Sequence, residues 1–202
     1  MKEEDLKRDY KAIVIGGSAG SFQVLSQIFN RIPQGFNLPI IMCCHRLKHI
    51  KNGFVEALEI KSQKKIEEPE DKEVIKRGKV YLAPANYHMS IELGYSFSLS
   101  TEEMYNNSRP AIDITFESAA YAYKEKLIGI LLTGANKDGA LGMKEIHKRG
   151  GLTIVQDPQE CVVQTMPAAA ISMTKVDYIL KVEQIIKFLN DLHKHHCNEK
   201  VF

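Results

Sequence analysis

Short apolar runs alternate with amphipathic helical segments along most of this chain, and this alternation constrains the fold more than any other feature. Residues 11–15 form an apolar run of strand length, and behind it Leu25, Ile28, Phe29 and Ile32 recur at the spacing of one helix face. Because parallel strands need crossover connections, which are usually helices, the pattern predicts a mostly parallel sheet with helices on both faces. We therefore expect a doubly wound α/β fold.

Apolar periodicity and turn signals place the individual elements. The expected strands cover residues 11–15, 38–44, 79–83, 127–132, 152–156 and 176–180. The expected helices cover residues 25–32, about 49–60, 110–123, 137–148, 167–173 and 182–192. Residues 88–93 and 95–100 alternate apolar and polar around Gly94, which predicts an antiparallel β-hairpin added to the parallel strands.

Length and composition are those of an ordinary globular protein. The 202 residues, 44% of them hydrophobic, suffice to bury a sizeable core, and the sequence shows no repeat or obvious linker. We expect one domain over residues 1–202, with residues 1–10 as a charged N-terminal extension. The formal net charge of +2 gives no general attraction to nucleic acid or membranes. No apolar run approaches a membrane span or a signal-peptide core, so we expect a cytoplasmic protein without membrane insertion.

Three residues suited to acyl transfer follow three of the expected strands. Ser18 follows the first strand, His45 follows the second, and Asp138 comes after the strand at residues 127–132. Ligands of open α/β sheets bind outside the carboxyl ends of the strands, so these side chains are predicted to share one edge. Serine, histidine and aspartate serve as nucleophile, base and orienting acid in serine hydrolases. The sequence therefore predicts nucleophilic acyl transfer.

The glycine-rich segment around Ser18 fits two functions. Gly16-x-Ser18-x-Gly20 has the pattern of a nucleophile elbow, whose flanking glycines relieve the crowding of a sharp turn. A phosphate-binding loop is the alternative. A dinucleotide fingerprint needs glycine where Ser18 stands and a carboxylate at the end of the second strand, where the chain has His45. The mismatches favour the nucleophile.

The other candidate residues have bland alternatives. Asp138 alone would be explained as an acid at a helix start, favoured by the helix dipole, and His45 as a structural histidine; their shared edge with Ser18 favours catalysis. The N–H groups of Ala19 and of the turn containing Ala135 are candidates for an oxyanion hole. Met166 is a candidate for the pocket lining, with burial in the core as the alternative.

The C-terminal tail permits a metal-binding interpretation that its spacing disfavours. His193, His195, His196 and Cys197 could hold a metal, but they lack the paired spacing of structural zinc sites. A polar helix end is the favoured interpretation. We expect neither a metal nor a cofactor.

Several segments, taken together and in order, resemble the catalytic domain of chemotaxis protein-glutamate methylesterases, the CheB family. They span nearly the whole chain. The segments are IGGSAG at residues 15–20, HR at 45–46, YLAPANYH at 81–88, RPAID at 109–113, LTG with KDGA at 132–140, and VQDP with MP at 155–158 and 166–167.

This resemblance implies hydrolysis of γ-glutamyl methyl esters on the cytoplasmic helices of methyl-accepting chemotaxis receptors. It maps the nucleophile, base and orienting acid onto Ser18, His45 and Asp138. Some members also deamidate receptor glutamines by the same acyl chemistry, and a cognate methyltransferase or another chemosensory component is an implied partner. The alternative is a catalytically weak or inactive interaction module in a two-component or chemosensory pathway.

Charge near the active edge offers one means of substrate binding. Arg46, Lys48, Lys51 and Lys137 are candidates to complement acidic receptor helices, with a solvated basic surface as the alternative.

The chain departs from the family pattern in three ways. Ala19 stands where many members have threonine, and Ser21 where glycine is usual. Regulated members also carry an N-terminal receiver domain of on the order of a hundred residues, for which the sequence before the first strand leaves no room. We therefore expect a stand-alone catalytic domain.

Overall fold

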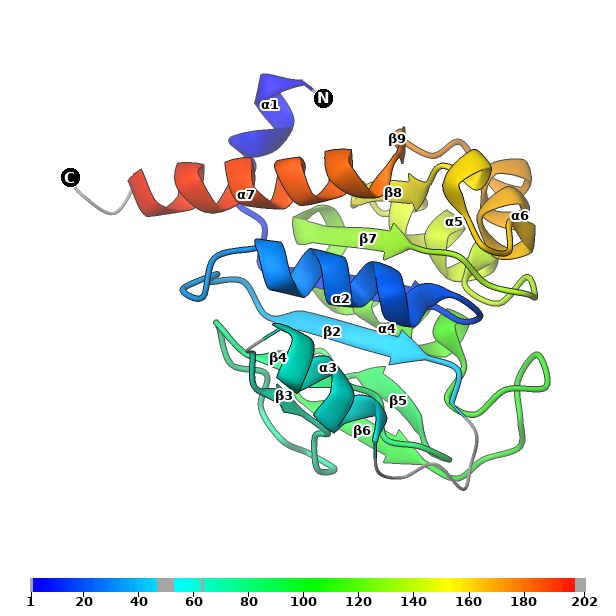
Figure 1. Cartoon of the computed structure of the whole chain (residues 1–202). Coiled ribbons are helices and arrows are strands. Elements are labelled where there is room, and N and C mark those ends of the chain that lie inside the picture. The colour runs from blue at the N-terminus through cyan, green and yellow to red at the C-terminus, as the bar shows by residue number, and fades with distance from the viewer. Residues whose placement is uncertain (1, 47–52, 63, 199–202) are drawn as a thin grey trace.

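A seven-stranded sheet forms the centre of the computed structural model, with the strands in the order β3-β4-β2-β1-β7-β8-β9 (Figure 1). The structure describes residues 2–46, 53–62 and 64–198, with the side chains of 196–198 excluded. All neighbouring strands pair in parallel. The strands are β1 (Ala12–Gly17), β2 (Ile40–Cys44), β3 (Ile66–Glu67), β4 (Val80–Leu82), β7 (Leu127–Leu131), β8 (Leu152–Gln156) and β9 (Tyr178–Leu180).

The strand order reverses at β1, which lies between β2 and β7. The register places Gly17 opposite Cys44, and Gly16 opposite Leu131. The chain therefore leaves β1, β2 and β7 at neighbouring points of one edge. Such a reversal opens a crevice outside the carboxyl ends of the strands, where ligands of doubly wound folds bind.

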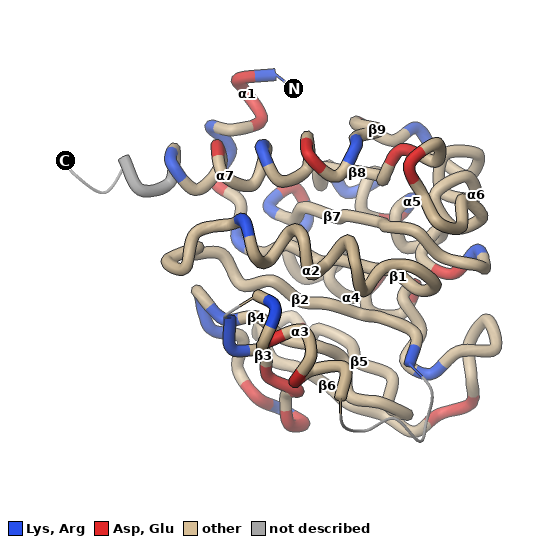
Figure 2. Tube along the Cα trace, viewed as in Figure 1, with Lys and Arg blue, Asp and Glu red and all other residues tan. Residues whose placement is uncertain are grey.

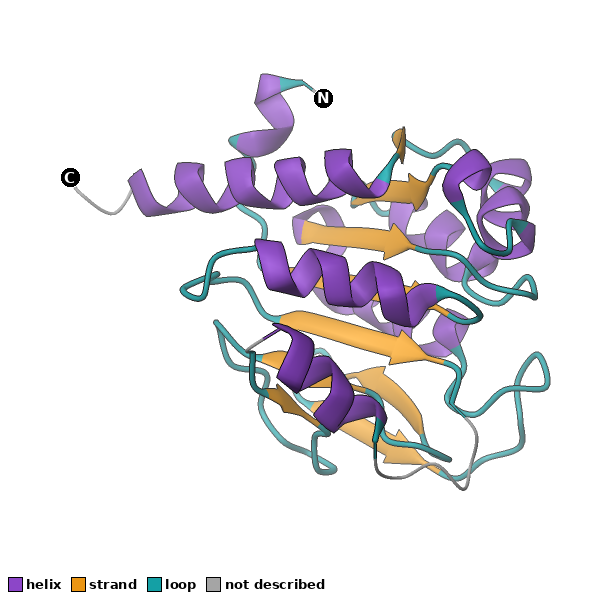
Figure 3. Ribbon diagram, viewed as in Figure 1, coloured by secondary structure: helices purple, strands orange, loops and turns teal. Residues whose placement is uncertain are grey.

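Helices cover both faces of the sheet (Figure 3). One face carries α2 (Ser21–Arg31), α3 (Phe54–Ser62) and α7 (Val182–Asn198), and the other carries α4 (Ile112–Tyr123), α5 (Ala140–Lys148) and α6 (Thr165–Met173). The short helix α1 (Glu3–Leu6) packs near α7, and two 3₁₀ turns, η1 (Lys124–Lys126) and η2 (Pro158–Glu160), complete the helical elements of the described residues. The doubly wound α/β prediction is confirmed.

Two hydrophobic layers sandwich the sheet because alternate strand residues point to opposite faces. In β1, Ile13 and Ile15 belong to the layer under α2 and α7, whereas Val14 belongs to the layer under α4 and α5. All three side chains are fully buried. Each such burial contributes about 1.5–3 kcal/mol, so the two layers fix which way every strand faces.

The predicted hairpin is present but forms a separate small sheet. Strands β5 (His88–Ile91) and β6 (Phe97–Ser100) pair antiparallel, and neither joins the seven-stranded sheet. The hairpin packs on α4, where the Thr115 hydroxyl donates to the Met89 carbonyl at 2.7 Å and the Ile91 N–H donates to Ser118 Oγ at 3.0 Å. The hairpin thus extends the molecule beside α4 rather than widening the main sheet.

Several element boundaries differ from the sequence prediction. β1 continues through Gly16 and Gly17, which we expected in the loop, because both pair with β2. α5 begins at Ala140 rather than residue 137, after Gly139 with a left-handed φ of 95°. The expected helix start near residue 49 lies outside the described residues, and α3 runs from Phe54. The two-residue strand β3 was missed, since so short a run carries no periodicity.

The distribution of charged residues does not indicate the fold. Figure 2 shows basic and acidic segments interspersed along the trace, in keeping with the net charge of +2. Among the helices of the described residues, none combines the length and the apolar character that crossing a bilayer requires.

Candidate active site

Ser18 and His45 lie side by side where β1 and β2 end. The N–H of His45 donates to the Gly17 carbonyl at 3.3 Å, and the N–H of Ser18 donates to the carbonyl of Thr133, beyond β7, at 2.9 Å. Both side chains line one cavity of about 480 Å³. Its other lining residues include Ala19, Arg46, Met104, Arg109 and Pro110. The predicted convergence of three strand ends is therefore observed.

The glycines beside Ser18 serve close packing as well as a turn. A Cβ on Gly16 would lie 2.6 Å from Cγ2 of Ile112 on α4, so this glycine admits the helix rather than shaping the loop. Gly20 does shape the loop, with a φ of 84° that favours glycine. Ser21 then begins α2, and its hydroxyl donates to the Ser18 carbonyl at 2.7 Å. Ser21 thus fastens the turn that presents Ser18.

His45 is held by Asp138. Its Nε2 atom lies 2.7 Å from Oδ2 of Asp138, and the Asp138 carboxylate is fully buried. The same carboxylate accepts the N–H of Ile112 at 2.7 Å on Oδ2 and the N–H of Asp113 at 3.1 Å on Oδ1. These donors come from the start of α4, so α4 fixes the acid that meets the imidazole.

The hydrogen bonds decide the charge of Asp138. Burial acts to raise its pKa, but the hydrogen bonds from His45 and from the N–H groups of Ile112 and Asp113 outweigh burial and hold the pKa below its ordinary value. Asp138 is therefore ionised at neutral pH. An ionised carboxylate only accepts, so Nε2 of His45 carries a proton and Nδ1 of the neutral ring is the free acceptor.

A second buried acid, Asp113, was not predicted as a site residue. Its Oδ1 accepts the N–H groups of Gly139 and Gly142, both at 2.8 Å, so it holds the first turn of α5 beside Asp138. Burial, with the Asp138 charge adding to it, raises the pKa of Asp113 to about 6. The available signal was an acid at helical spacing from Phe116 and Ala120 on the apolar face of α4.

The predicted oxyanion and substrate residues are placed unequally. Ala19 is exposed and lines the cavity with Ser18, and Ala135 is exposed on the neighbouring turn. The N–H of Gly134 donates to the Val163 carbonyl at 3.1 Å, so this group of the turn already has a partner. Met166 is fully buried, and a Cβ on Gly134 would lie 2.5 Å from its Cε. Met166 thus supports the turn from beneath, and a substrate contact stays a prediction.

The structure shows fewer exposed basic side chains near the active edge than the sequence predicted. The Arg46 side chain is only 3% exposed, because it forms an ion pair with Glu68 and donates to the Ala83 carbonyl at 2.7 Å. Lys137 is exposed. Lys48 and Lys51 lie outside the described residues. Arg46 is therefore better described as part of the cavity wall than as a solvated cation.

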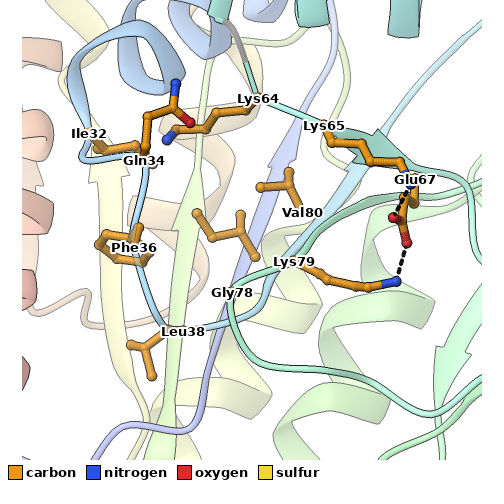
Figure 4. Close-up of a pocket in the computed structure, with 11 residues that line it drawn as sticks. Ile32, Gln34, Phe36, Leu38, Lys64, Lys65, Glu67, Gly78, Lys79 and Val80 are labelled. Carbon is orange, nitrogen blue, oxygen red and sulfur yellow. Dashed lines mark hydrogen bonds and ion pairs between the residues drawn. The ribbon is translucent and has the colours of Figure 1, made fainter.

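A different cavity, of about 340 Å³, lies at the opposite edge of the sheet, where β2 and β4 begin (Figure 4). Lys64 reaches across it toward Gln34, and a Glu67–Lys79 ion pair marks the far wall. The buried Lys64 ammonium donates to the Pro33 carbonyl at 2.8 Å, just beyond the end of α2, where a cation is favoured by the helix dipole. The presence of Lys64 in this cavity is therefore explained by its contact at the end of α2.

Within the described residues, no three His, Cys, Asp or Glu side chains gather as metal ligands would. The side chains of His196 and Cys197, part of the tail considered for metal binding, are not among those described.

Comparison with known proteins places the chain in a family. A family model described as CheB methylesterase matches residues 13–189. A putative protein-glutamate methylesterase/protein-glutamine glutaminase of Leptospira interrogans is 43% identical over 95% of this chain and 100% of that protein. The protein-glutamate methylesterase/protein-glutamine glutaminase of Thermotoga maritima is 35% identical over 90% of this chain, which spans 54% of that relative.

A solved structure extends the likeness to three dimensions. The crystal structure of the Thermotoga maritima CheB methylesterase catalytic domain matches with a TM-score of 0.85 and 34% identity, covering 92% of this chain and 100% of that one. The sheet, its covering helices and the length of matched sequence all agree. The chain therefore belongs to the CheB methylesterase family of carboxylic ester hydrolases.

Proposed function

We propose that this protein is a protein-glutamate methylesterase that hydrolyses γ-glutamyl methyl esters on chemotaxis-type receptors, with Ser18, His45 and Asp138 as its catalytic triad. The observation that carries the proposal is the 2.7 Å contact between His45 Nε2 and the buried, ionised Asp138, beside Ser18 on one cavity. A serine hydroxyl needs a base oriented in this way before it can attack an ester.

Acylation begins when Ser18 Oγ attacks the ester carbonyl and passes its proton to Nδ1 of His45. Nε2 keeps its proton and its hydrogen bond to Asp138, whose negative charge stabilises the imidazolium. The proton on Nδ1 then moves to the methoxy oxygen, and methanol leaves. A γ-glutamyl ester of Ser18 remains.

Deacylation repeats the same proton transfers with water. His45 takes a proton from the water that attacks the acyl-enzyme, and returns it to Ser18 Oγ as the glutamate carboxylate departs. A glutamine side chain would enter by the same first step, with ammonia as the leaving group. The Ala19 N–H, directly after the nucleophile, is the proposed first donor to the oxyanion, and an N–H from the turn containing Ala135 the second.

The biological setting follows from the same proposal. The substrate is a cytoplasmic helix of a methyl-accepting receptor, and a methyltransferase or another chemosensory protein is the expected functional partner. The reaction as written uses neither metal nor cofactor. We propose a single catalytic domain working in the cytoplasm.

Methanol release from a methylated receptor tests the function directly. Ser18→Ala is expected to lower kcat by about 10³-fold or more, as for other nucleophiles of this kind. Ser172→Ala is a matched control, because this exposed serine on α6 donates to the Ala169 carbonyl of its own helix. A fluorophosphonate should label Ser18 in wild type and in the control.

Two outcomes would contradict the proposal. Unchanged turnover in Ser18→Ala would exclude Ser18 as the nucleophile. A wild-type protein that neither releases methanol nor takes up the fluorophosphonate would favour the inactive interaction module.

A further inference from the structure

The loop at residues 101–110 forms one wall of the Ser18 cavity. Met104, Arg109 and Pro110 line that cavity. Arg109 fastens the loop, since its guanidinium donates to the carbonyls of Thr101 and Glu102 and to Oδ1 of Asn86. A substrate in the cavity would therefore touch a wall that has a defined shape.

A tight turn at the centre of this loop presents Asn106. Tyr105 and Ser108 exchange backbone hydrogen bonds of 3.2 and 2.9 Å. Between them, Asn106 and Asn107 have φ values of 52° and 58°. Positive φ at both central positions is what a type I′ turn requires, and asparagine tolerates it better than most residues. The turn fixes where the Asn106 side chain points.

The side-chain amide of Asn106 bridges two buried carboxylates. Its Nδ2 atom lies 3.0 Å from Oδ2 of Asp113 and 3.2 Å from Oδ1 of Asp138. Asp113 is 1% exposed and Asp138 is 0% exposed. Ionised carboxylates can only accept, so the nitrogen end of the amide must face them, and its two protons serve one acid each. A neutral donor thus stands between two like charges.

We propose that Asn106 is a positioning residue: its amide holds the Asp138 carboxylate so that Oδ2 faces His45, and it thereby couples the substrate-facing loop to the catalytic base. The inference rests on the proposed function of Ser18, His45 and Asp138. Oδ1 of Asp138 receives Asn106 and the Asp113 N–H, which leaves Oδ2 for His45 and the Ile112 N–H. Rotation of the carboxylate would break both pairs.

Several charged and titratable groups surround the Asn106 amide. Asp113 faces the negative charges of Asp138 and Glu117, and Tyr105 lies beside the two aspartates, while the imidazole of His45 contacts Asp138. Removing the Asn106 donor removes a stabilisation of both ionised carboxylates, so the pKa of each would rise. Asp113, whose pKa of about 6 is already near neutral, would then be protonated in more of the protein at pH 7. The Asp138 carboxylate would lose the side-chain donor that fixes its orientation toward His45.

Asn106→Gly is the informative variant, because glycine adopts the left-handed backbone without strain and only the amide is lost. Asn107→Gly makes the same substitution at the next position of the turn, and it produces the Asn-Gly pair that type I′ turns favour. Only Asn106→Gly removes the bridge; Asn107 itself lines the Ser18 cavity, so the two variants are compared by the pH dependence of the rates and not by the size of kcat. Both are compared with wild type as the full chain.

The rate of fluorophosphonate labelling of Ser18 and kcat for methanol release are measured from pH 5 to 9. Asn106→Gly is expected to lower both at pH 7 by roughly tenfold or more, as expected for a lost hydrogen bond to a charged group. In Asn106→Gly, the acid limb of both pH–rate profiles should move to higher pH by about one unit. Asn107→Gly should keep the wild-type pH profile.

Carboxyl ¹³C NMR titration separates this inference from the proposed function, since it needs no turnover. The Asp113 titration should move to higher pH in Asn106→Gly and stay in place in Asn107→Gly. Equal titrations and equal pH profiles in both variants would overturn the positioning role. Turnover that persists in Ser18→Ala would instead reject the proposed function while leaving the carboxylate bridge open to this measurement.

Discussion

The Nε2 atom of His45 lies 2.7 Å from the Oδ2 atom of Asp138, so the proposed mechanism assigns acceptance of the Ser18 proton to Nδ1. In the serine protease template the two ring nitrogens have the opposite roles. His45 directly follows β2, while Asp138 comes from the turn before α5 and is fixed by N–H groups of α4.

Asp138→Asn tests this tautomer assignment. The amide nitrogen that the substitution introduces would donate to Nε2 of His45 and move the ring proton to Nδ1, where it blocks acceptance of the Ser18 proton. We expect kcat to fall by about 10⁴-fold, as in the serine protease case, with KM changing little.

Asp157→Asn is the matched control for this substitution. Asp157 also follows a strand of the same sheet, and its carboxylate accepts the Gln159 N–H at 3.0 Å in a 3₁₀ turn. Activity should persist in this variant. A loss below tenfold in Asp138→Asn would show that the imidazole does not depend on the buried acid.

Asp113 is predicted to make stability depend on pH in an unusual direction. Its pKa of about 6 lies above the ordinary 3.8, so the folded state favours the protonated form. That contribution is complete below about pH 4 and is lost as pH rises through 6. In urea unfolding, the stability of Asp113→Asn relative to wild type should therefore improve between pH 4 and 7, by up to about 3 kcal/mol.

The stability of Asp138→Asn relative to wild type should change with pH in the opposite direction. The Asp138 pKa is depressed, so its contribution is present above the unfolded pKa and is lost on acidification. The deficit of Asp138→Asn should grow as pH rises from 2 to 5. Two parallel curves for the two variants would contradict the assignment of one raised and one lowered carboxyl.

The sequence was sufficient to predict the convergence of Ser18, His45 and Asp138, because each follows a buried apolar strand and parallel strands share their carboxyl edge. It was insufficient for Asp113 and Asn106. Their proximity to Asp138 depends on how α4 packs against α5 and on a turn type that no apolar periodicity encodes. Contacts between elements, unlike the elements themselves, have no local signature.

Gly16 shows a second limit of sequence interpretation. The pattern Gly-x-Ser-x-Gly was interpreted as a loop, yet Gly16 lies inside β1 and gives room to Ile112 and Phe116 of α4. A glycine that relieves a turn and a glycine that admits a helix look identical in one dimension. The left-handed φ of Gly20 is the turn that the pattern predicted.

Met166 is predicted to act through packing. It is fully buried against Gly134, so Met166→Ala should lower the free energy of unfolding by about 2–5 kcal/mol, measured by urea denaturation. KM, assayed well below the melting temperature, should change little. Gly134→Ala should be destabilising alone and less so in combination with Met166→Ala, which removes the two Met166 atoms that approach most closely, Cε and Sδ. A large KM increase with unchanged stability would instead support the substrate contact.

Thr133 is predicted to join the nucleophile loop to its neighbours. Its buried hydroxyl accepts the Val163 N–H at 3.0 Å and lies 3.0 Å from the carbonyls of Ala19 and Val163, to one of which it donates its proton. Its carbonyl accepts the Ser18 N–H. Thr133→Val keeps the shape but removes the side-chain partner of the Val163 N–H and of the neighbouring carbonyls, at a cost of about 0.5–1.5 kcal/mol for each hydrogen bond lost.

Thr133→Val should also slow fluorophosphonate labelling of Ser18. The loop that positions Ser18 Oγ would lose the contact between the Thr133 hydroxyl and the Ala19 carbonyl. Thr133→Ser retains the hydroxyl and is the matched control, losing only the methyl group. The two variants therefore separate the hydrogen bonds from the packing. If Thr133→Val kept the stability and labelling rate of wild type while Thr133→Ser lost them, the methyl contact would be responsible, and the hydroxyl would have no part in positioning Ser18.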